Sequence, residues 1–318
     1  MSARAPSPAT TGLPATHGGD NPLSGIVMML LAVALFSVMD TLAKLLTTDF
    51  PAAQILLFRG GVALLILAPL AWRLGGGLDL VHQARRAPGK LLLAGLLGFG
   101  ALASFLMAWR ELPLVELGAI LFAAPLIVTA LSVPLLKEAV GIHRWSAVVV
   151  GFAGVLIVLQ PGGAVFVPAA LWAIVGTLFY ALWLISLRTA GKAVSSVLVA
   201  VTNALIMTVL ALPFALWQWT PPSPEQAAGL VGIGLVGGLA QLCLVRAFSL
   251  APAALVAPFD YSYTVYAAAL GYAVFGDIPA SSTWLGLVLL TAAGLYIIHR
   301  ERLNARRSRS RAPVTGGE

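Results

Sequence analysis

Four ionisable residues of this sequence lie inside long apolar runs, where charge is costly. Asp40 and Lys44 share one run, Arg59 lies in the middle of the next, and Asp260 lies in a run near the end of the chain. A charge within a bilayer needs a partner or water, so such residues are candidates for binding a ligand or a proton.

Asp40 and Lys44 are four residues apart, so a helix places them on one face. Two interpretations stay open: an intrahelical ion pair, with Lys44 reaching toward the headgroups, or a pair that faces a cavity and contacts a ligand. Asp260 has no basic neighbour within one turn of its own helix. Asp40 and Asp260 are therefore the candidates for proton coupling. Asp260 is the better candidate to bind and release a proton, because Asp40 has Lys44 beside it to keep it ionised.

Arg59 cannot lose its proton, so within an apolar run it needs a carboxylate, carbonyl groups or water. It either forms an ion pair with Asp40 that locks two helices together, or it contacts an anionic or polar group of a ligand. The matching position in the second half of the chain is Asn203. The polar character of the position thus recurs without the charge, which predicts an electrostatically asymmetric binding site.

Aromatic residues with polar tips occur in two pairs at helical spacing. Tyr263 and Tyr266 are three residues apart, as are Tyr180 and Trp183. Such side chains suit planar organic solutes, although a stripe of this kind is also common in ordinary packing. With Arg59, Lys44 and Asn203, these four residues complete the predicted ligand-binding set.

The elements that must position these residues are membrane-spanning helices. The chain has 318 residues, 59% of them hydrophobic and 10% charged, whereas soluble chains have about 45–50% apolar and about 25% charged residues. A spanning helix needs roughly 20 residues. Pro125 and Pro258 are candidate unwinding points or ordinary membrane prolines. The sequence predicts an all-α integral membrane protein with ten transmembrane helices, at residues 24–46, 52–72, 90–110, 114–136, 145–160, 169–188, 194–218, 227–248, 251–275 and 282–299.

Basic residues gather on alternate connections and in the tail at 300–318, while the opposite connections hold a single one, Arg110. By the positive-inside rule both termini are cytoplasmic, as expected for a multi-pass protein of the inner or plasma membrane. This distribution explains the net charge of +7 without nucleic acid. Residues 1–23 are expected to be a disordered tail.

The two halves of the chain resemble each other. One spacing carries Pro113 onto Pro252 and Trp145 onto Trp284. Five helices in each half is an odd number, so the second half is expected to lie inverted relative to the first. Inverted repeats with a midplane site are typical of secondary transporters. The predicted repeats are residues 24–160 and 169–299.

Several segments resemble the drug/metabolite transporter superfamily of the EamA-domain type, in its ten-helix bacterial form. They include LFSVMDTLAKLL at 35–46 and AWRELPLVELGAILFAAPLIV at 108–128. The resemblance implies two inverted five-helix repeats around a central cavity. It also implies secondary transport of a small organic solute or metabolite by alternating access, with proton coupling or exchange left open. The MD-x-x-x-K and FR patterns are similar to those of bacterial members linked to S-adenosylmethionine or riboflavin uptake.

The alternative is a membrane-embedded enzyme acting on a lipid-linked substrate, which would need polar clusters on the loops. The sequence contains no G-x-S-x-G, no phosphate-binding loop and no metal-ligand spacing, and its one cysteine, Cys243, excludes an intrachain disulfide. We therefore expect no catalytic residues, no metal and no cofactor. The expected partners are the lipid bilayer and a small-molecule substrate, without nucleic acid and with a homodimer left open.

Overall fold

The computed structural model describes residues 22–74, 77–136, 142–159, 168–190, 194–251 and 253–310. Within these residues all regular structure is helical. Most of the predicted N-terminal tail and the residues after 310 lie outside the described chain. The helices are α1 (Pro22–Leu46), α2 (Ala52–Leu74), α3 (Gly77–Arg86), α4 (Pro88–Trp109), α5 (Leu114–Leu121), α6 (Ala124–Leu136), α7 (Ile142–Leu159), α8 (Pro168–Ala190), α9 (Ser196–Trp217), α10 (Pro224–Leu250), α11 (Ala253–Val256), η1 (Ala257–Ser262), α12 (Tyr263–Leu270), η2 (Gly271–Phe275) and α13 (Ser281–Ser310).

The described chain contains seven helical stretches that are long and apolar enough to cross a membrane. Large apolar side chains project from their surfaces, among them Leu65 at 75% and Trp217 at 79% exposure, which suits a surface in contact with lipid. The predicted all-helical membrane fold is confirmed at this level. The stretches are Leu23–Leu46, Ala52–Arg73, Pro88–Trp109, Leu114–Leu135, Pro168–Leu187, Val197–Trp217 and Pro224–Leu250; shorter apolar helices cover Trp145–Leu159 and Ser281–Tyr296.

The segment predicted as one helix at 114–136 is broken into α5 and α6. Between them, Phe122 N donates to Gly118 O at 3.1 Å and Ala123 N donates to Ile120 O at 3.0 Å, so the chain tightens before α6 begins. Pro125 follows directly. It has no N–H group, so it is tolerated in the first turn of a helix but not in an interior. The break therefore has a local cause in the sequence.

The segment predicted as one helix at 251–275 is divided into α11, η1, α12 and η2. The 3₁₀ turn η1 contains Pro258, and η2 is a π-helical turn. Gly276 ends η2 with φ of 70°, a left-handed conformation that glycine adopts without strain. Asp277 N then donates to Gly271 O at 3.1 Å, which closes the helix end as in a Schellman motif. The backbone thus fixes the place of Asp277.

Helix α3 was not predicted, because its glycine-rich start suggests a loop. Its polar face carries Asp79, whose carboxylate accepts a hydrogen bond from Gln83 Nε2 at 2.8 Å. Gln83 Oε1 also accepts from Ser195 N at 2.9 Å, at the start of α9. Leu80 and Leu198 belong to one apolar cluster that joins the two elements. The amphipathic helix α3, which follows α2, therefore contacts the beginning of α9 through a hydrogen bond and apolar side chains.

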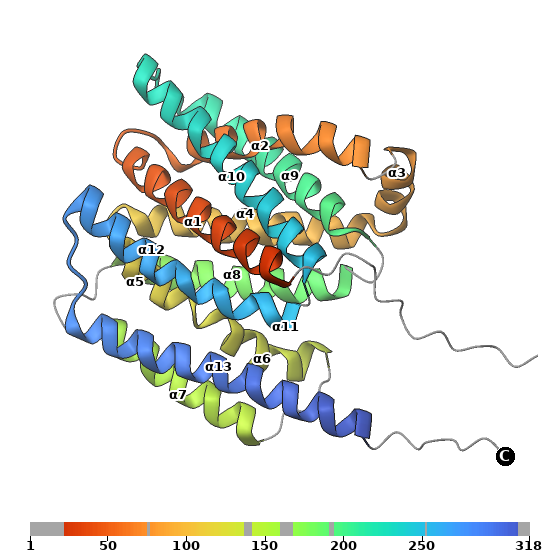
Figure 1. The fold of residues 1–318 in the computed structure, drawn as a ribbon. Helices are drawn as coiled ribbons and strands as arrows, with labels where there is room; N and C mark the ends of the chain where they lie inside the picture. Colours follow the sequence, from red (N-terminus) through yellow and green to blue (C-terminus); the bar gives the residue numbers. More distant parts are fainter. Residues whose placement is uncertain are drawn as a thin grey trace, which may run out of the picture.

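Figure 1 shows the helices running in broadly parallel and antiparallel directions. The most extensive contacts pair α1 with α10, α2 with α9, α4 with α8, and α7 with α13. Close approach requires small residues at the crossings. A Cβ atom at Gly234 of α10 would overlap Val62 of α2 and lie 2.8 Å from Phe58 O. Fully buried apolar side chains form the main core cluster, among them Phe50, Ile55, Leu106, Leu117, Leu230 and Ile233.

Candidate functional site

Asp40, Arg59 and Tyr263 meet, although they come from α1, α2 and α12. Tyr263 Oη donates to Asp40 Oδ2 at 3.0 Å, and Arg59 Nη1 lies 3.9 Å from Asp40 Oδ1. The side chains of Asp40 and Arg59 are each 14% exposed. A separation of 3.9 Å is an ion pair but not a hydrogen bond. The carboxylate thus compensates the charge of the guanidinium without locking its position.

Hydrogen-bonding capacity remains open around this ion pair. Among the described residues, Arg59 Nη1, Ser37 Oγ and Ser262 Oγ are buried and have no hydrogen-bond partner. Buried polar atoms normally have partners, so unpaired ones indicate groups that bound water or a ligand can satisfy. Of the two interpretations of Arg59, the ion pair with Asp40 is present, and it leaves Nη1 without a hydrogen-bond partner among the described residues.

Asp260 lies in the 3₁₀ turn η1, between α11 and α12. Its side chain is exposed in the isolated chain, and it forms no ion pair within the described residues. It is close enough to Tyr180, Tyr261 and Tyr263 to interact with them electrostatically. Tyr263 therefore links Asp260 with the Asp40 and Arg59 pair.

The two predicted aromatic pairs have different surroundings. The rings of Tyr180 and Trp183 stack on α8, with centroids 5.4 Å apart and planes at 29°. Trp183 Nε1, and Asn203 Oδ1 on α9, are buried atoms without a partner among the described residues. Tyr263 bonds to Asp40, whereas Tyr266 is partly buried against the main apolar core. The structure thus brings Tyr180 and Tyr263 toward Asp260 and leaves Tyr266 in a packing position.

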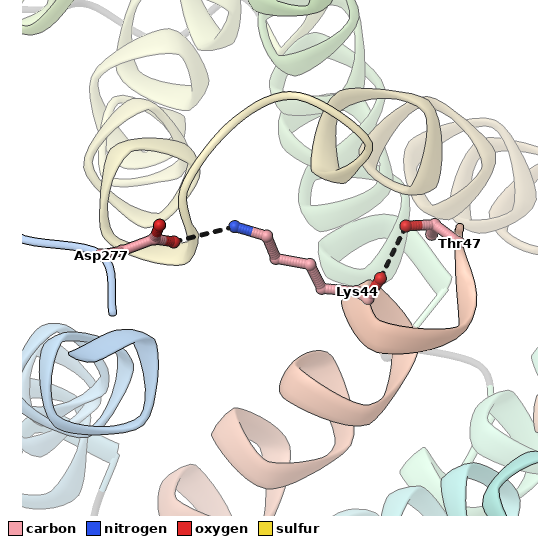
Figure 2. Close-up of polar contacts among 3 residues, drawn as sticks. All are labelled: Lys44, Thr47 and Asp277. Carbon is pink, nitrogen blue, oxygen red and sulfur yellow. Dashed lines mark hydrogen bonds and ion pairs between the residues drawn. The ribbon is translucent and has the colours of Figure 1, made fainter. Parts of the chain in front are cut away.

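Lys44 does not pair with Asp40. Its Nζ lies 3.0 Å from Asp277 Oδ2 and 4.5 Å from the centre of the Phe275 ring. Thr47 Oγ1 donates to Lys44 O at 2.7 Å and so closes the last turn of α1. Figure 2 shows Lys44 extended from the end of α1 toward Asp277. Glu116, at the start of α5 and 8% exposed, interacts electrostatically with both groups.

Asp277 was not predicted as a site residue, because it lies in a connection between two apolar runs. A signal was available in retrospect: Gly276 ends a helix immediately before it, which fixes the backbone of the next residue. The repeat partner suggested for Asp277 by its spacing, Glu138, lies outside the described residues. The ion pair of Lys44 and Asp277 joins segments far apart in the chain, so spacing alone does not reveal it.

These features define a multi-pass helical membrane protein with charged and aromatic groups gathered inside the bundle, as expected of a protein that carries a polar solute. Residues 23–160 and 167–299 each match the EamA-like transporter family. The chain therefore belongs to the EamA-like transporter family, in agreement with the resemblance of its sequence to drug/metabolite transporters.

Curated relatives agree with this family. The chain is 29% identical over 280 residues to an S-adenosylmethionine uptake transporter of Rickettsia prowazekii. This match covers 88% of this chain and 94% of that protein. It is 28% identical over 296 residues to a riboflavin transporter of Vibrio cholerae, covering 91% and 98%. It is 27% identical over 274 residues to the pseudopaline exporter CntI of Pseudomonas aeruginosa, covering 85% and 94%.

A solved crystal structure has a similar fold, with a TM-score of 0.59 and 18% sequence identity. The match covers 90% of this chain and 98% of the other. That likeness concerns the fold alone. The family and the relatives establish a transporter of a small organic solute and give no support to the enzyme alternative. The expectation that the chain is not an enzyme is confirmed on the same ground.

Proposed function

We propose that the chain carries its solute by alternating access through a central site between two inverted five-helix repeats. Taking α5 with α6, and α11 through η2, as single broken spans gives ten spans. If each span is replaced by the one five positions further along, α1 and α10 become α8 and α4, which are also in extensive contact. The same replacement exchanges α2 and α9, which contact each other. This symmetry of contacts supports the proposal. In both halves the broken span is the fourth, and transporters commonly place their sites at such breaks.

The single observation that carries the proposed site is the loose ion pair of Arg59 and Asp40, with Tyr263 bonded to the same carboxylate. We assign to Arg59 the contact with an anionic or polar group of the solute, since its Nη1 is buried without a hydrogen-bond partner in the described chain. Asp40 holds the guanidinium near that group. Tyr263, Tyr180 and Trp183 supply aromatic contacts, Asn203 supplies an amide, and Tyr266 supports Tyr263 from the following turn.

We assign proton coupling to Asp260. Its carboxylate is accessible, lies near tyrosine hydroxyls, and has no cationic partner among the described residues. A carboxylate with no cation beside it binds a proton more readily than one held in an ion pair. Asp40 differs in having Arg59 beside it, so it stays ionised and serves binding.

Lys44 closes the outer end of the site rather than binding the solute directly. The alternate basic connections orient both termini toward the cytoplasm, which places the end of α1 outside. There the ion pair of Lys44 and Asp277 joins α1 to the connection after η2. Outward opening requires this pair to separate. Glu116 offers Lys44 a second carboxylate when it does.

The substrate is proposed to be a metabolite comparable to those named for the relatives: S-adenosylmethionine, riboflavin or pseudopaline. The proposed location is a bacterial inner membrane. A reporter fused after residue 311 should be cytoplasmic and one inserted near residue 162 external; both positions lie outside the described residues. An external C-terminus would contradict the orientation.

The test is uptake of labelled S-adenosylmethionine and riboflavin by proteoliposomes that contain the purified chain. We expect one of them, or a competitor identified by inhibition, to accumulate faster than in empty liposomes. Preloading with the same unlabelled compound should accelerate entry, as alternating access predicts. Arg59→Ala should abolish that flux while the protein stays inserted and folded. Flux without acceleration by preloaded substrate, and without any effect of Arg59→Ala, would contradict the proposal.

A further inference from the structure

Two buried polar atoms on helices that both pack against α4 lack partners in the described chain, one a donor and one an acceptor. They are Trp183 Nε1 on α8 and Asn203 Oδ1 on α9, each without a hydrogen bond among the described residues. An unpaired buried donor or acceptor destabilises a fold, because the group has lost its water without replacement. One of each in the same place indicates that something absent from the free chain pairs with both.

The indole nitrogen of Trp183 and the amide group of Asn203 both lie beside Gly98 on α4. A Cβ atom built on Gly98 would lie 3.4 Å from Trp183 Nε1 and 4.0 Å from Asn203 Nδ2. The pyrrole edge of the indole and the side-chain amide thus border one small region. Because Gly98 has no side chain, no methyl group covers the indole N–H on the α4 side.

Helix packing does not explain the glycine at this position. At Gly95 an added Cβ would overlap Ile206, and at Gly100 it would lie 3.1 Å from the ring of Phe179, so close helix contact requires glycine at both. At Gly98 the same Cβ atom would make only ordinary contacts. The packing of α4 therefore does not by itself require glycine beside Trp183 and Asn203.

A flat aromatic surface completes the region. Tyr180 and Trp183 stack at 5.4 Å on α8, and Tyr180 also interacts with Asp260. Aromatic faces favour flat rings stacked with an offset. The region is thus continuous with the proposed transport site and differs from it in offering a hydrogen-bonding edge without charge.

We infer that Trp183, Asn203 and Gly98 bind the edge of a planar nitrogen heterocycle that carries an acceptor beside an N–H donor. Trp183 N–H donates to a ring nitrogen or carbonyl, and Asn203 Oδ1 accepts from the adjacent amino or imino group. Gly98 keeps the indole N–H free of a covering methyl group on the α4 side. This inference rests on the proposed function, since it names the chemical class of one part of the solute.

The experiment measures binding of adenosine and of purine riboside to the purified full chain by calorimetry. Adenosine presents a ring nitrogen beside an amino group, whereas purine riboside lacks the amino donor. We expect purine riboside to bind about ten-fold more weakly, the effect of one hydrogen bond lost with its acceptor left unpaired. Asn203→Leu should reduce adenosine binding to the level of purine riboside. Trp183→Phe should weaken both ligands, because both present the ring nitrogen.

Two further variants separate binding from folding. Gly98→Ala should fold, since its Cβ makes no overlap, yet it should weaken both ligands because its methyl group would lie 3.4 Å from the indole nitrogen that binds them. Trp109→Phe is the matched control: Trp109 Nε1 is also unpartnered in the described chain, but its ring packs beside Phe105 in the apolar core. That variant should bind both ligands like the unmodified chain.

Three results would overturn the inference: equal binding of the two ribosides, discrimination that survives Asn203→Leu, or no binding of either at millimolar concentration. Ordered water would then be the partner of the two atoms. Uptake of S-adenosylmethionine and riboflavin by the same preparation separates this outcome from failure of the proposed function. Uptake without riboside discrimination removes only the heterocycle site, and discrimination without uptake of any solute removes only the transport mechanism.

Discussion

Separating Lys44 from Asp277 should favour the outward-open state of the transporter. The two atoms are 3.0 Å apart, and the side chains are 14% and 27% exposed. The pair is therefore intermediate between exposed pairs, which contribute about 0–1 kcal/mol, and buried ones, whose disruption costs about 3–5 kcal/mol. A loss of about 1.4 kcal/mol corresponds to a ten-fold change in population. We expect about that shift for Lys44→Met.

The two single substitutions should shift the outward-open population by different amounts. Lys44→Met leaves Asp277 and Glu116 together without a cation, and like charges at close range repel. Asp277→Asn keeps the backbone bond from its own N–H to Gly271 and leaves Glu116 as a partner for Lys44. The shift for Asp277→Asn should therefore be several-fold smaller than for Lys44→Met. The exchange Lys44→Asp with Asp277→Lys should restore part of the closed population.

The assay is the rate at which an externally added, membrane-impermeant maleimide labels Ser37→Cys in a Cys243→Ser background. Ser37 is 1% exposed and lies one turn before Asp40, so labelling reports opening of the outer side. Arg110→Met removes an exposed basic residue near the same end and should leave the rate unchanged. Equal rates for Lys44→Met and the unmodified protein, or no recovery in the exchange variant, would refute the closing role of the pair.

Further outcomes concern binding, coupling and packing. Arg59→Lys should recover little of the transport that Arg59→Ala loses, because an ammonium group does not reproduce the fork of a guanidinium; full transport by either variant in proteoliposomes would contradict this. Asp260→Asn should remove the response of net flux to an imposed pH step and leave exchange at equal pH largely intact; a normal response to the pH step would exclude Asp260 as the proton site. Gly234→Ala should destabilise the protein by about 1–3 kcal/mol through overpacking, seen as a lower melting temperature. Gly232→Ala is its control, since the nearest atom to the added Cβ is 3.8 Å away; an equal effect of both would contradict the packing argument.

Sequence reasoning predicted well what depends on composition and local spacing. The long apolar stretches follow from hydropathy alone, and the residues with costly charges identified Asp40 and Arg59, which the structure brings together. The two prolines considered as unwinding points, Pro125 and Pro258, lie at the start of α6 and within η1. Each of these features has its cause within a few residues of the chain.

What could not be predicted depends on contacts between distant segments. Tyr263 bonds to Asp40 and Lys44 pairs with Asp277, each across more than two hundred residues. No helical periodicity connects such residues. The helix α3 was missed for another reason: its start is rich in glycine, and its few apolar residues gain their stabilising contacts only from α2, α4 and α9. The local sequence pattern thus predicts where the charged residues lie, whereas their partners depend on the tertiary packing of distant segments.

The pairing of the helices has a consequence for biosynthesis. Each of the four most extensive helix contacts joins the first half of the chain to the second: α1 to α10, α2 to α9, α4 to α8, and α7 to α13. Helices leave the ribosome in order, so the early ones enter the bilayer long before these partners exist. Until then Asp40 lacks its hydrogen bond from Tyr263, and Lys44 lacks its partner Asp277. We expect the first half expressed alone to be degraded, and the two halves expressed together from separate genes to assemble.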